Sequence, residues 1–560
     1  MGALFPVLLL VSAARPTADP DSALLRAVPY IDAAAREHLR REPAPGLALA
    51  VVADGHVVLV RAYGVADLAS GAEVTAGTRF LAGSVSKAFT AVALLQLQEE
   101  GLLDVRRPVT DYLSWFRVRG ADAPITLHHL LTHTAGLPRD RSDLPSSPYT
   151  ALALRDRVVA APPGTRFAYS NIGYQLLSLV IEEVVGRPFT QTIREQVLAP
   201  LGLARTDPGV TQEARLTTAT GYEYLFDDRP PLPGEPVVPA AWGEYSAGDA
   251  NLVTTAPDLG RFLAALLDQG APAGHRLLQP QSFARLVQRT VPAPELGPGS
   301  YYGYGVVLTD IEGDPVLWHS GGMPGFRAML IGDLDERVGV VLLMNGPGAP
   351  RALGEYALRA LIAARRGKTP PPVPVAAPAD SIPEAAEWSG DYADSTGQVL
   401  AVRSEGARLL LREGDARVRL LRGGPDRLLA ADSGWSRYPL RGVREGGRIV
   451  ELVHGPRWFR RVGSPAAPAR RAPADWQAYA GHYRAQVPYD SNVRVVVRHG
   501  QLLLLSPEGI EEELVPGPGG TFLVGAEGLG VERVRFLDLV SGRALRLDLS
   551  GTSYYRATSP

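Results

Sequence analysis

The sequence predicts an α/β (α+β) domain with a central antiparallel sheet and a helical region, followed by two small antiparallel β-barrels. Three observations support this fold class. In the first 365 residues, strand patterns lie at both ends and helical patterns lie between them. The rest of the chain repeats one strand-rich module. Two Pro/Ala-rich stretches without periodicity mark the joints between these parts.

The domain boundaries follow from these two stretches. We expect the first domain over residues 25–366, a linker over 367–383, the first barrel over 384–463, a linker over 464–474 and the second barrel over 475–560. Residues 1–24 are set apart because an apolar run and the small residues after it are typical of a signal peptide, although no basic residue precedes the run. This favours a secreted or periplasmic protein, with a cytoplasmic protein as the alternative.

The composition excludes several classes of protein. The chain has 560 residues, 46% of them hydrophobic, and a formal net charge of −2, so nothing in its charge predicts binding to nucleic acid. It has no cysteine, which excludes disulfides, thiol nucleophiles and Cys-ligated metals. No later apolar run is long enough for a membrane-spanning helix. We expect a small-molecule or peptide substrate, no cofactor and no metal, while homo-oligomer formation stays open.

The elements of the first domain begin with two strands and end with a meander. Strands at 47–52 and 57–62 flank Asp54-Gly55, which is a hairpin turn signal. A helix from Lys87 toward Gly101 is apolar nearly all round, which predicts burial. Further helices are expected at about 173–185 and 351–364, and strands at 316–320, 326–331 and 338–344.

The two barrels are predicted from an internal repeat. Residues 388–392 match 479–483, and alternating strands around a glycine turn follow each of them. The repeats also close alike, with residues 455–460 against 551–556, so that Arg460 corresponds to Arg556. Short strands with turn signals and almost no helical pattern are typical of small antiparallel barrels.

Lys87 is one of only two lysines in a chain that otherwise uses arginine, and it lies three residues after Ser84. Side chains at i and i+3 share a helix face, so the amine can reach the hydroxyl. Lysine can act as a base when burial favours its neutral form, whereas arginine keeps its proton. The pair indicates an activated serine nucleophile. A snorkelling surface lysine is the alternative, which the apolar surroundings disfavour.

Tyr169 and Asn171 lie in a loop that runs into the helix at about 173–185. Spaced by one residue in an extended segment, both side chains can face one pocket. A tyrosine can relay a proton, and an asparagine can orient a lysine and a substrate amide. The alternative is a helix N-cap, in which Ser170 or Asn171 caps the helix and Tyr169 only packs.

His319 ends a strand and opens a Gly-rich turn from Gly321 to Gly325. Glycines here let a substrate backbone approach the strand and leave an N–H free to face it. A hairpin with an incidental histidine is the alternative. His129 and His133 are four residues apart, but no glutamate follows the first, so a structural helix end is favoured over a metal site.

Taken together, Ser-x-x-Lys, Tyr-x-Asn and His-x-Gly, in this order, resemble the penicillin-recognising serine hydrolases. This group includes class C β-lactamases, D-peptidases, D-aminopeptidases and related esterases. Residues 80–84, 129–137 and 163–171 also look like this family, and the resemblance covers about residues 25–365. It implies a β-lactamase/transpeptidase-like first domain. The three-domain layout is similar to bacterial D-aminopeptidases, whose two C-terminal barrels are lipocalin-like.

The resemblance implies a role for each motif. Ser84 would attack the substrate, and Lys87 and Tyr169 would share the proton transfers. Asn171 would orient the lysine and the substrate. The N–H groups of Ser84 and Gly322 would form the oxyanion hole.

On the same strand, Gly321 would lie along the substrate, and His319 would replace the lysine of many β-lactamases. A histidine is only partly charged at neutral pH, so its grip on a substrate carboxylate would be weaker. This departure counts against a dedicated β-lactamase.

The sequence therefore predicts a serine hydrolase that cleaves an amide or ester through an acyl-enzyme, with a D-amino-acid peptide or a small ester as substrate. The alternatives are a β-lactamase, a penicillin-binding sensor that does not turn over, and ligand-binding barrels beside an inactive first domain. In the D-aminopeptidases a loop of the last barrel reaches the active-site mouth, and residues 486–492 are the candidate for such a loop here.

Overall fold

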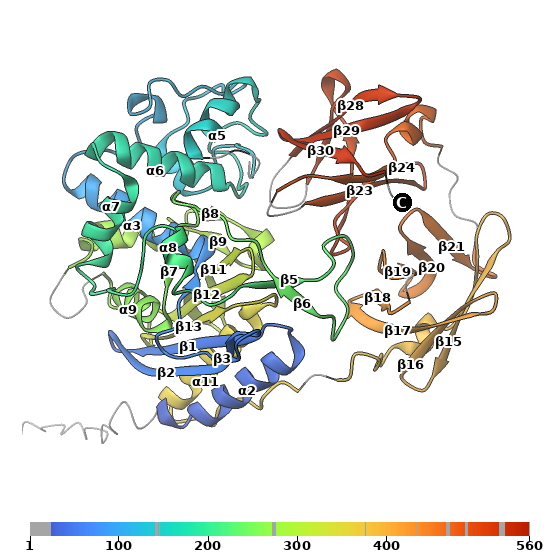
Figure 1. Ribbon diagram of the computed structural model, residues 1–560, viewed down its shortest axis with the longest axis horizontal. Helices are drawn as coiled ribbons and strands as arrows, with labels where there is room; N and C mark the ends of the chain where they lie inside the picture. The colour runs from blue at the N-terminus through green and yellow to red at the C-terminus, as the bar shows by residue number, and fades with distance from the viewer. Residues whose placement is uncertain are drawn as a thin grey trace, which may run out of the picture.

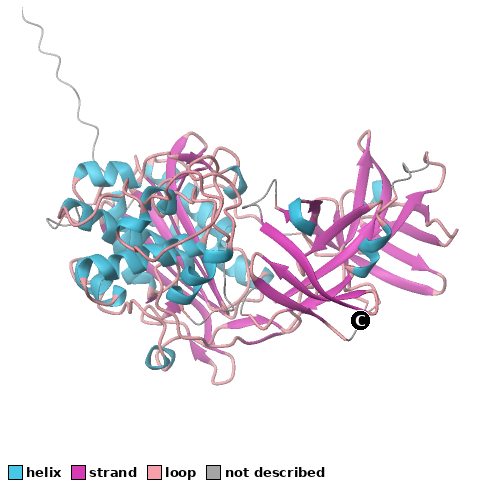
Figure 2. Cartoon of the chain, turned by 90° about the horizontal axis from the view of Figure 1, so that it is seen from above, coloured by secondary structure: helices cyan, strands magenta, loops and turns pink. Residues whose placement is uncertain are grey.

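The computed structural model describes residues 24–139, 144, 146–270, 276–375, 377–432, 434–465, 471–487, 491–525 and 532–558. A helix-rich first domain lies beside two strand-rich units (Figures 1 and 2). The expected signal peptide at 1–24 falls almost wholly outside the described residues. Among the described residues, no helix has both the length and the apolar composition required to cross a membrane.

The first domain is built on one antiparallel sheet whose order is β3-β2-β1-β13-β12-β11-β10-β9-β8. Strand β1 pairs with β13 from Leu47 opposite Met344 to Ala53 opposite Val338. The two ends of the domain's sequence therefore meet inside one sheet, as predicted. The strands are β1 (Gly46–Ala53), β2 (His56–Asp67), β3 (Ala72–Glu73), β8 (Val291–Pro292), β9 (Tyr301–Tyr302), β10 (Val307–Ile311), β11 (Asp314–Met323), β12 (Phe326–Asp333) and β13 (Val338–Met344).

Helices cover both faces of this sheet. Every residue of β1 is buried, and successive residues pack on opposite sides. Residues 48, 50 and 52 join one hydrophobic cluster with α3 and α9, whereas residues 47, 49, 51 and 53 join another with α2 and α11. The helices are α2 (Val28–Arg41), α3 (Ser86–Glu99), α4 (Leu127–Leu131), α5 (Ser147–Ala153), α6 (Asn171–Val185), α7 (Phe189–Ile193), α8 (Gln212–Arg215), α9 (Ala256–Leu267), α10 (Pro280–Leu286) and α11 (Pro350–Arg365).

The three predicted helices are confirmed as α3, α6 and α11, and each starts one or two residues earlier than expected. The predicted turn from Gly321 to Gly325 is wrong in extent. Strand β11 continues through Gly321 and Gly322 because both residues pair with β12. Only Pro324 and Gly325 connect the two strands, and Gly325 has a φ of 77°, which favours glycine.

The C-terminal part contains the two expected barrels. Strands β14 to β21 form a closed barrel, called barrel 1, and β22 to β30 form a nine-stranded, nearly closed sheet, called barrel 2. The strands of barrel 1 are β14 (Gly390–Ala393), β15 (Val399–Glu405), β16 (Arg408–Glu413), β17 (Ala416–Gly424), β18 (Arg427–Ala430), β19 (Leu440–Glu445), β20 (Arg448–His454) and β21 (Arg457–Arg461). Those of barrel 2 are β22 (Gly481–Arg484), β23 (Asn492–Arg498), β24 (Gln501–Leu505), β25 (Glu511–Glu513), β26 (Val515–Pro516), β27 (Phe522–Val524), β28 (Glu532–Val540), β29 (Arg543–Leu549) and β30 (Thr552–Arg556).

The repeat is visible in matching contacts, with one correction. Tyr392 in barrel 1 pairs with Arg461, and Tyr483 in barrel 2 pairs with Arg556. Each arginine donates to its tyrosine hydroxyl and to a main-chain carbonyl just before the first strand of its barrel. The counterpart of Arg556 is therefore Arg461 and not Arg460. A one-residue shift turns a strand side chain to the opposite face, so the sequence match alone did not fix the register.

Candidate active site

Ser84 lies in a 3-10 turn, Gly83–Val85, that leads directly into α3. Among residues 80–90, all of which are described, it is the only one that is not buried. The 3-10 turn ends at Val85 and α3 begins at Ser86, so Ser84 lies just before the helix. Ser84 is thus partly exposed just before a helix whose first residues are buried in the core.

Lys87 is fully buried, with no exposed surface. Its Nζ lies 3.0 Å from Ser84 Oγ, 2.8 Å from Asn171 Oδ1 and 3.0 Å from the carbonyl oxygen of Asp249. Two of these partners can only accept hydrogen bonds. They can take two N–H groups of the amine and leave its remaining position directed at the serine hydroxyl. A snorkelling surface lysine is excluded.

The second motif brings its residues to the same place, and its N-cap interpretation is confirmed. Ser170 is the N-cap of α6, because its Oγ accepts a hydrogen bond from Gly173 N at 3.2 Å. Asn171 begins the helix and contacts Lys87. The ring centroid of Tyr169 lies 5.0 Å from Lys87 Nζ. The N-cap therefore directs the other two side chains toward the lysine.

Strand β11 contacts the turn that carries Ser84. A Cβ placed on Gly321 would lie 1.9 Å from Ala82 O and 3.1 Å from Ser84 N, and a Cβ on Gly83 would lie 2.6 Å from Gly322 N. Only glycine allows this approach of two backbone segments. Gly321 was expected to let a substrate backbone approach the strand. In the structure it packs against the protein's own main chain at Ala82. It brings the N–H groups of Ser84 and Gly322 to adjacent backbone segments.

His319 differs from its predicted electrostatic state. It is buried, and its Nδ1–H donates to Ser320 O at 2.6 Å while Nε2 accepts from the Tyr302 hydroxyl at 3.0 Å. Burial, reinforced by the charge of Lys87, lowers the pKa of His319 to about 3. The imidazole is neutral at physiological pH and both nitrogens are engaged, so it carries no positive charge for a substrate carboxylate.

An aromatic cluster around His133 supports the second motif, and sequence reasoning missed it. His133 Nδ1 accepts a hydrogen bond from Ser170 N at 3.1 Å, and its ring centroid is 4.3 Å from that of Tyr169 and 4.6 Å from that of Tyr302. Burial, followed by the charge of Lys87, lowers the pKa of His133 well below its usual range. His133 also has a left-handed φ of 56°, which the sequence does not display.

The carbonyl of Asp249 was also missed, since a main-chain acceptor has no sequence signature. The segment is attached to α3 through Leu252 N, which donates to Ser86 Oγ at 3.1 Å, and through Thr90, whose hydroxyl donates to Gly248 O at 2.6 Å. These bonds hold the Asp249 carbonyl within hydrogen-bond distance of Lys87 Nζ.

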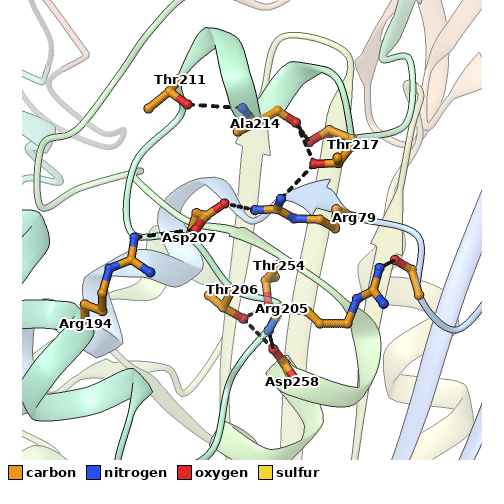
Figure 3. Close-up of polar contacts among 12 residues, drawn as sticks. Arg79, Arg194, Arg205, Thr206, Asp207, Thr211, Ala214, Thr217, Thr254 and Asp258 are labelled. Carbon is orange, nitrogen blue, oxygen red and sulfur yellow. Dashed lines mark hydrogen bonds and ion pairs between the residues drawn. The ribbon is translucent and has the colours of Figure 1, made fainter.

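Arg79 lies at the start of the short segment that leads through β4 to Ser84. It forms an ion pair with Asp207 and donates to Thr217 Oγ1 at 2.8 Å (Figure 3). The strand after it, β4 (Phe80–Leu81), pairs with β7 (Val253–Thr254). A cavity of about 520 Å³ opens beside this ion pair, but none of the predicted site residues lines it. We therefore place the candidate site at Ser84 and not in this cavity.

No group of three or more His, Asp or Glu side chains suited to a metal ion occurs in the part of the chain that the structure describes. The side chain of His129 takes part in the N-terminal cap of α4, where its Nδ1 accepts from Thr126 N at 3.2 Å. The prediction that His129 has a structural role at a helix end is confirmed, and that end is the N-terminus of α4.

The fold agrees with comparison to known proteins. The chain belongs to the Beta-lactamase family, which it matches over residues 31–364. Penicillin-binding protein 4 of Amycolatopsis lactamdurans is 31% identical over 363 residues, covering 62% of this chain and 93% of that protein.

Solved structures extend the likeness. The octameric penicillin-binding protein homologue from Pyrococcus abyssi has a TM-score of 0.54 at 22% identity and covers 79% of this chain and 100% of its own. EstCE1, a hydrolase with promiscuous acyltransferase activity, has a TM-score of 0.51 at 22% identity and covers 61% of this chain and 100% of its own. At these identities the likeness concerns the fold.

Proposed function

We propose that this protein is a serine hydrolase that cleaves an amide or ester bond through an acyl-enzyme on Ser84. The observation that carries the proposal is the contact between the hydroxyl of a partly exposed serine and a fully buried amine, 3.0 Å apart, whose other polar partners are acceptors. This is the geometry of a nucleophile with an adjacent base. Membership of the Beta-lactamase family supports it.

The first step forms a bond between Ser84 Oγ and the substrate carbonyl carbon, while the hydroxyl proton moves to Lys87 Nζ. The oxygen that becomes negative is bound by the N–H groups of Ser84 and Gly322. Asn171 keeps the amine aligned through its Oδ1. Because the lysine has no exposed surface, water does not compete for its contact with the serine.

Tyr169 acts on the leaving group. Its ring centroid lies 5.0 Å from Lys87 Nζ. Its hydroxyl passes the proton from the amine to the departing nitrogen or oxygen as the bond between that atom and the carbonyl carbon breaks. A water molecule then attacks the acyl-enzyme and gives its proton back through the same groups. The carboxylic acid leaves, and the Ser84 hydroxyl is restored.

The substrate class we propose is a D-amino-acid peptide or a small ester. A buried neutral His319 gives no cation for a substrate carboxylate, which weighs against a dedicated β-lactamase. The similarity to a protein named as penicillin-binding favours reaction with penicillin as the second candidate, with slow release of the acyl group. Light scattering measures whether the chain forms a homo-oligomer, and N-terminal sequencing of the mature chain tests the expected export.

The test is covalent labelling. A fluorophosphonate probe should modify the peptide that contains Ser84 and should leave Ser84→Ala unlabelled. Turnover of p-nitrophenyl esters, D-amino-acid amides and nitrocefin then assigns the substrate class. Labelling that persists in Ser84→Ala would contradict the mechanism, and rapid nitrocefin turnover would replace the proposed substrate class by a β-lactam.

A further inference from the structure

A short main-chain segment lies between the second motif and barrel 2. Ser170 Oγ donates a hydrogen bond to Pro138 O at 2.6 Å, and Asn171 N donates to Arg139 O at 2.7 Å. On its other side, Arg139 N donates to Oε1 of Glu532, the first residue of β28, at 2.9 Å. Arg139 therefore binds the motif through its carbonyl and the barrel through its N–H.

The path from the barrel to the proposed base is short. Asn171 accepts the hydrogen bond from Lys87 Nζ at 2.8 Å, and its own main-chain N–H is held by Arg139. Hydrogen bonds therefore connect the Glu532 carboxylate to the Lys87 amine through two residues, Arg139 and Asn171. A displacement of Arg139 would be passed directly to the first residue of α6.

Barrel 2 is also fixed on the first domain by contacts far from Glu532 in sequence. Asp227 and Asp228, next to the hairpin of β5 (Tyr222–Tyr224) and β6 (Val237–Pro239), bind two arginines of the barrel. Arg494 contacts Asp228 at 3.0 Å with a side chain only 6% exposed, and Arg484 contacts Asp227 at 3.0 Å. Figure 1 shows this hairpin extending toward the barrels. The position of the barrel thus does not depend on Glu532 alone.

The loop predicted to reach the active-site mouth falls in the same region. Residues 488–490 lie outside the described residues. Ser491 and Asn492, at its end, contact Asp227 through its carboxylate at 3.0 Å and its carbonyl oxygen at 3.2 Å. The described end of this loop therefore belongs to the interface between the domains, and its entry into the mouth stays a prediction.

The positive charge of Arg139 also acts on barrel 2. Burial raises the pKa of Glu512, and the positive charge of Arg139 opposes this rise. The arginine therefore lies close enough to Glu512 for their charges to interact, in addition to its main-chain bond with Glu532. Two carboxyl groups of the barrel act on one residue of the first domain.

We propose that Glu532 is a positioning residue, supplied by barrel 2, that acts through the Arg139 main chain to hold Asn171 against Lys87. The inference rests on the proposed function of Ser84 and Lys87. It makes barrel 2 part of the active-site support, so that the first domain reaches its full reactivity only with the barrel in place.

The experiment compares Glu532→Ala and Glu532→Gln in the full chain, with the rate of Ser84 labelling by a fluorophosphonate as readout. Alanine removes the acceptor, and we expect labelling to be roughly 10- to 100-fold slower because small misplacements of catalytic groups are costly. Glutamine keeps an acceptor oxygen, so its rate should stay within about twofold of the unchanged protein. Arg484→Ala is the control, because it breaks an exposed ion pair in the same interface without touching Arg139.

Failure of this inference can be told apart from failure of the proposed function. If the unchanged protein is not labelled at Ser84, the proposed function is wrong. If it is labelled and Glu532→Ala reacts at the same rate, the inference is overturned. It is also overturned if glutamine is as slow as alanine, because the hydrogen bond would then not be the cause. Where the alanine variant does not fold, Glu532→Asp carries the test, since it withdraws the carboxylate by one methylene.

Discussion

Replacing Gly321 by alanine tests whether the close approach of β11 to the Ser84 turn creates the oxyanion hole. The added Cβ would lie 1.9 Å from Ala82 O, which is main chain and cannot rotate away. An ordinary contact needs about 3.5 Å, so the strand and the turn must separate by about 1.5 Å. The N–H groups of Ser84 and Gly322 lie on these two segments and would separate with them.

The expected loss follows from that displacement. A misplacement of about 1 Å can cost on the order of 10²-fold in rate, and loss of one oxyanion donor costs about 10²–10³-fold. We therefore expect Ser84 labelling to slow by at least about 10²-fold, or about 2.7 kcal/mol in the activation barrier. The assay is the labelling rate constant, measured on protein whose near-ultraviolet circular dichroism shows intact packing.

The neighbouring glycine offers a matched comparison. A Cβ on Gly322 would meet nothing closer than Arg327 Cδ at 3.9 Å, and alanine keeps the N–H. Gly322→Ala should therefore lose far less reactivity than Gly321→Ala. Equal rates for the two variants, or an unchanged rate in Gly321→Ala, would refute the reasoning that the close contact sets the site.

Three further predictions concern the base, pH and the domain interface. Lys87→Arg should lower kcat nearly as much as Lys87→Ala, by roughly 10²–10⁴-fold. Arginine cannot act as a base, and it does not fit the fully buried site. Substantial turnover by the arginine variant would mean that Lys87 is only an electrostatic partner. Burial lowers the pKa of His319 to about 3, and lowers that of His38 and His454 to about 4. The unfolded chain therefore takes up these protons first as the pH falls, so the free energy of unfolding should decrease between pH 7 and pH 5 by up to about 2 kcal/mol per histidine. Urea unfolding at both pH values measures this, and equal stability would contradict it. Arg494→Ala should lower the unfolding temperature of barrel 2 in calorimetry, because it removes one of the two arginines that pair with the partly buried Asp228 carboxylate. An unchanged transition would mean that the pair adds nothing.

Local patterns were sufficient for much of the fold. The helices α3, α6 and α11 and the strands of the meander were predictable because their apolar residues repeat with the period of the element. The joining of β1 to β13 was also expected, from strands at the two ends of one domain. The extent of β11 was not, because glycines are read as turn residues, whereas here pairing with β12 and close packing against Ala82 decide the conformation.

Part of the candidate site was likewise predictable from the sequence, and part was not. Ser84, Lys87, Tyr169 and Asn171 carry side-chain chemistry at fixed spacing, and the structure brings them together. The carbonyl of Asp249 had no signature in the sequence, because any residue could supply it. The charge of His319 was misjudged for a related reason, since burial and its bond to Tyr302 depend on tertiary packing.

The pairing of β1 with β13 has a consequence for synthesis of the protein. Leu47 and its partner Met344 are separated by nearly 300 residues, so at about 5–20 residues per second the ribosome completes the second strand about 15–60 s after the first. During that interval the apolar β1 has only β2 as a neighbour in the sheet. Contacts between such distant parts of a chain also form slowly. We therefore expect the newly made N-terminal hairpin to depend on chaperone protection, whereas each barrel, whose strands mostly pair with their neighbours in sequence, can close soon after it is made.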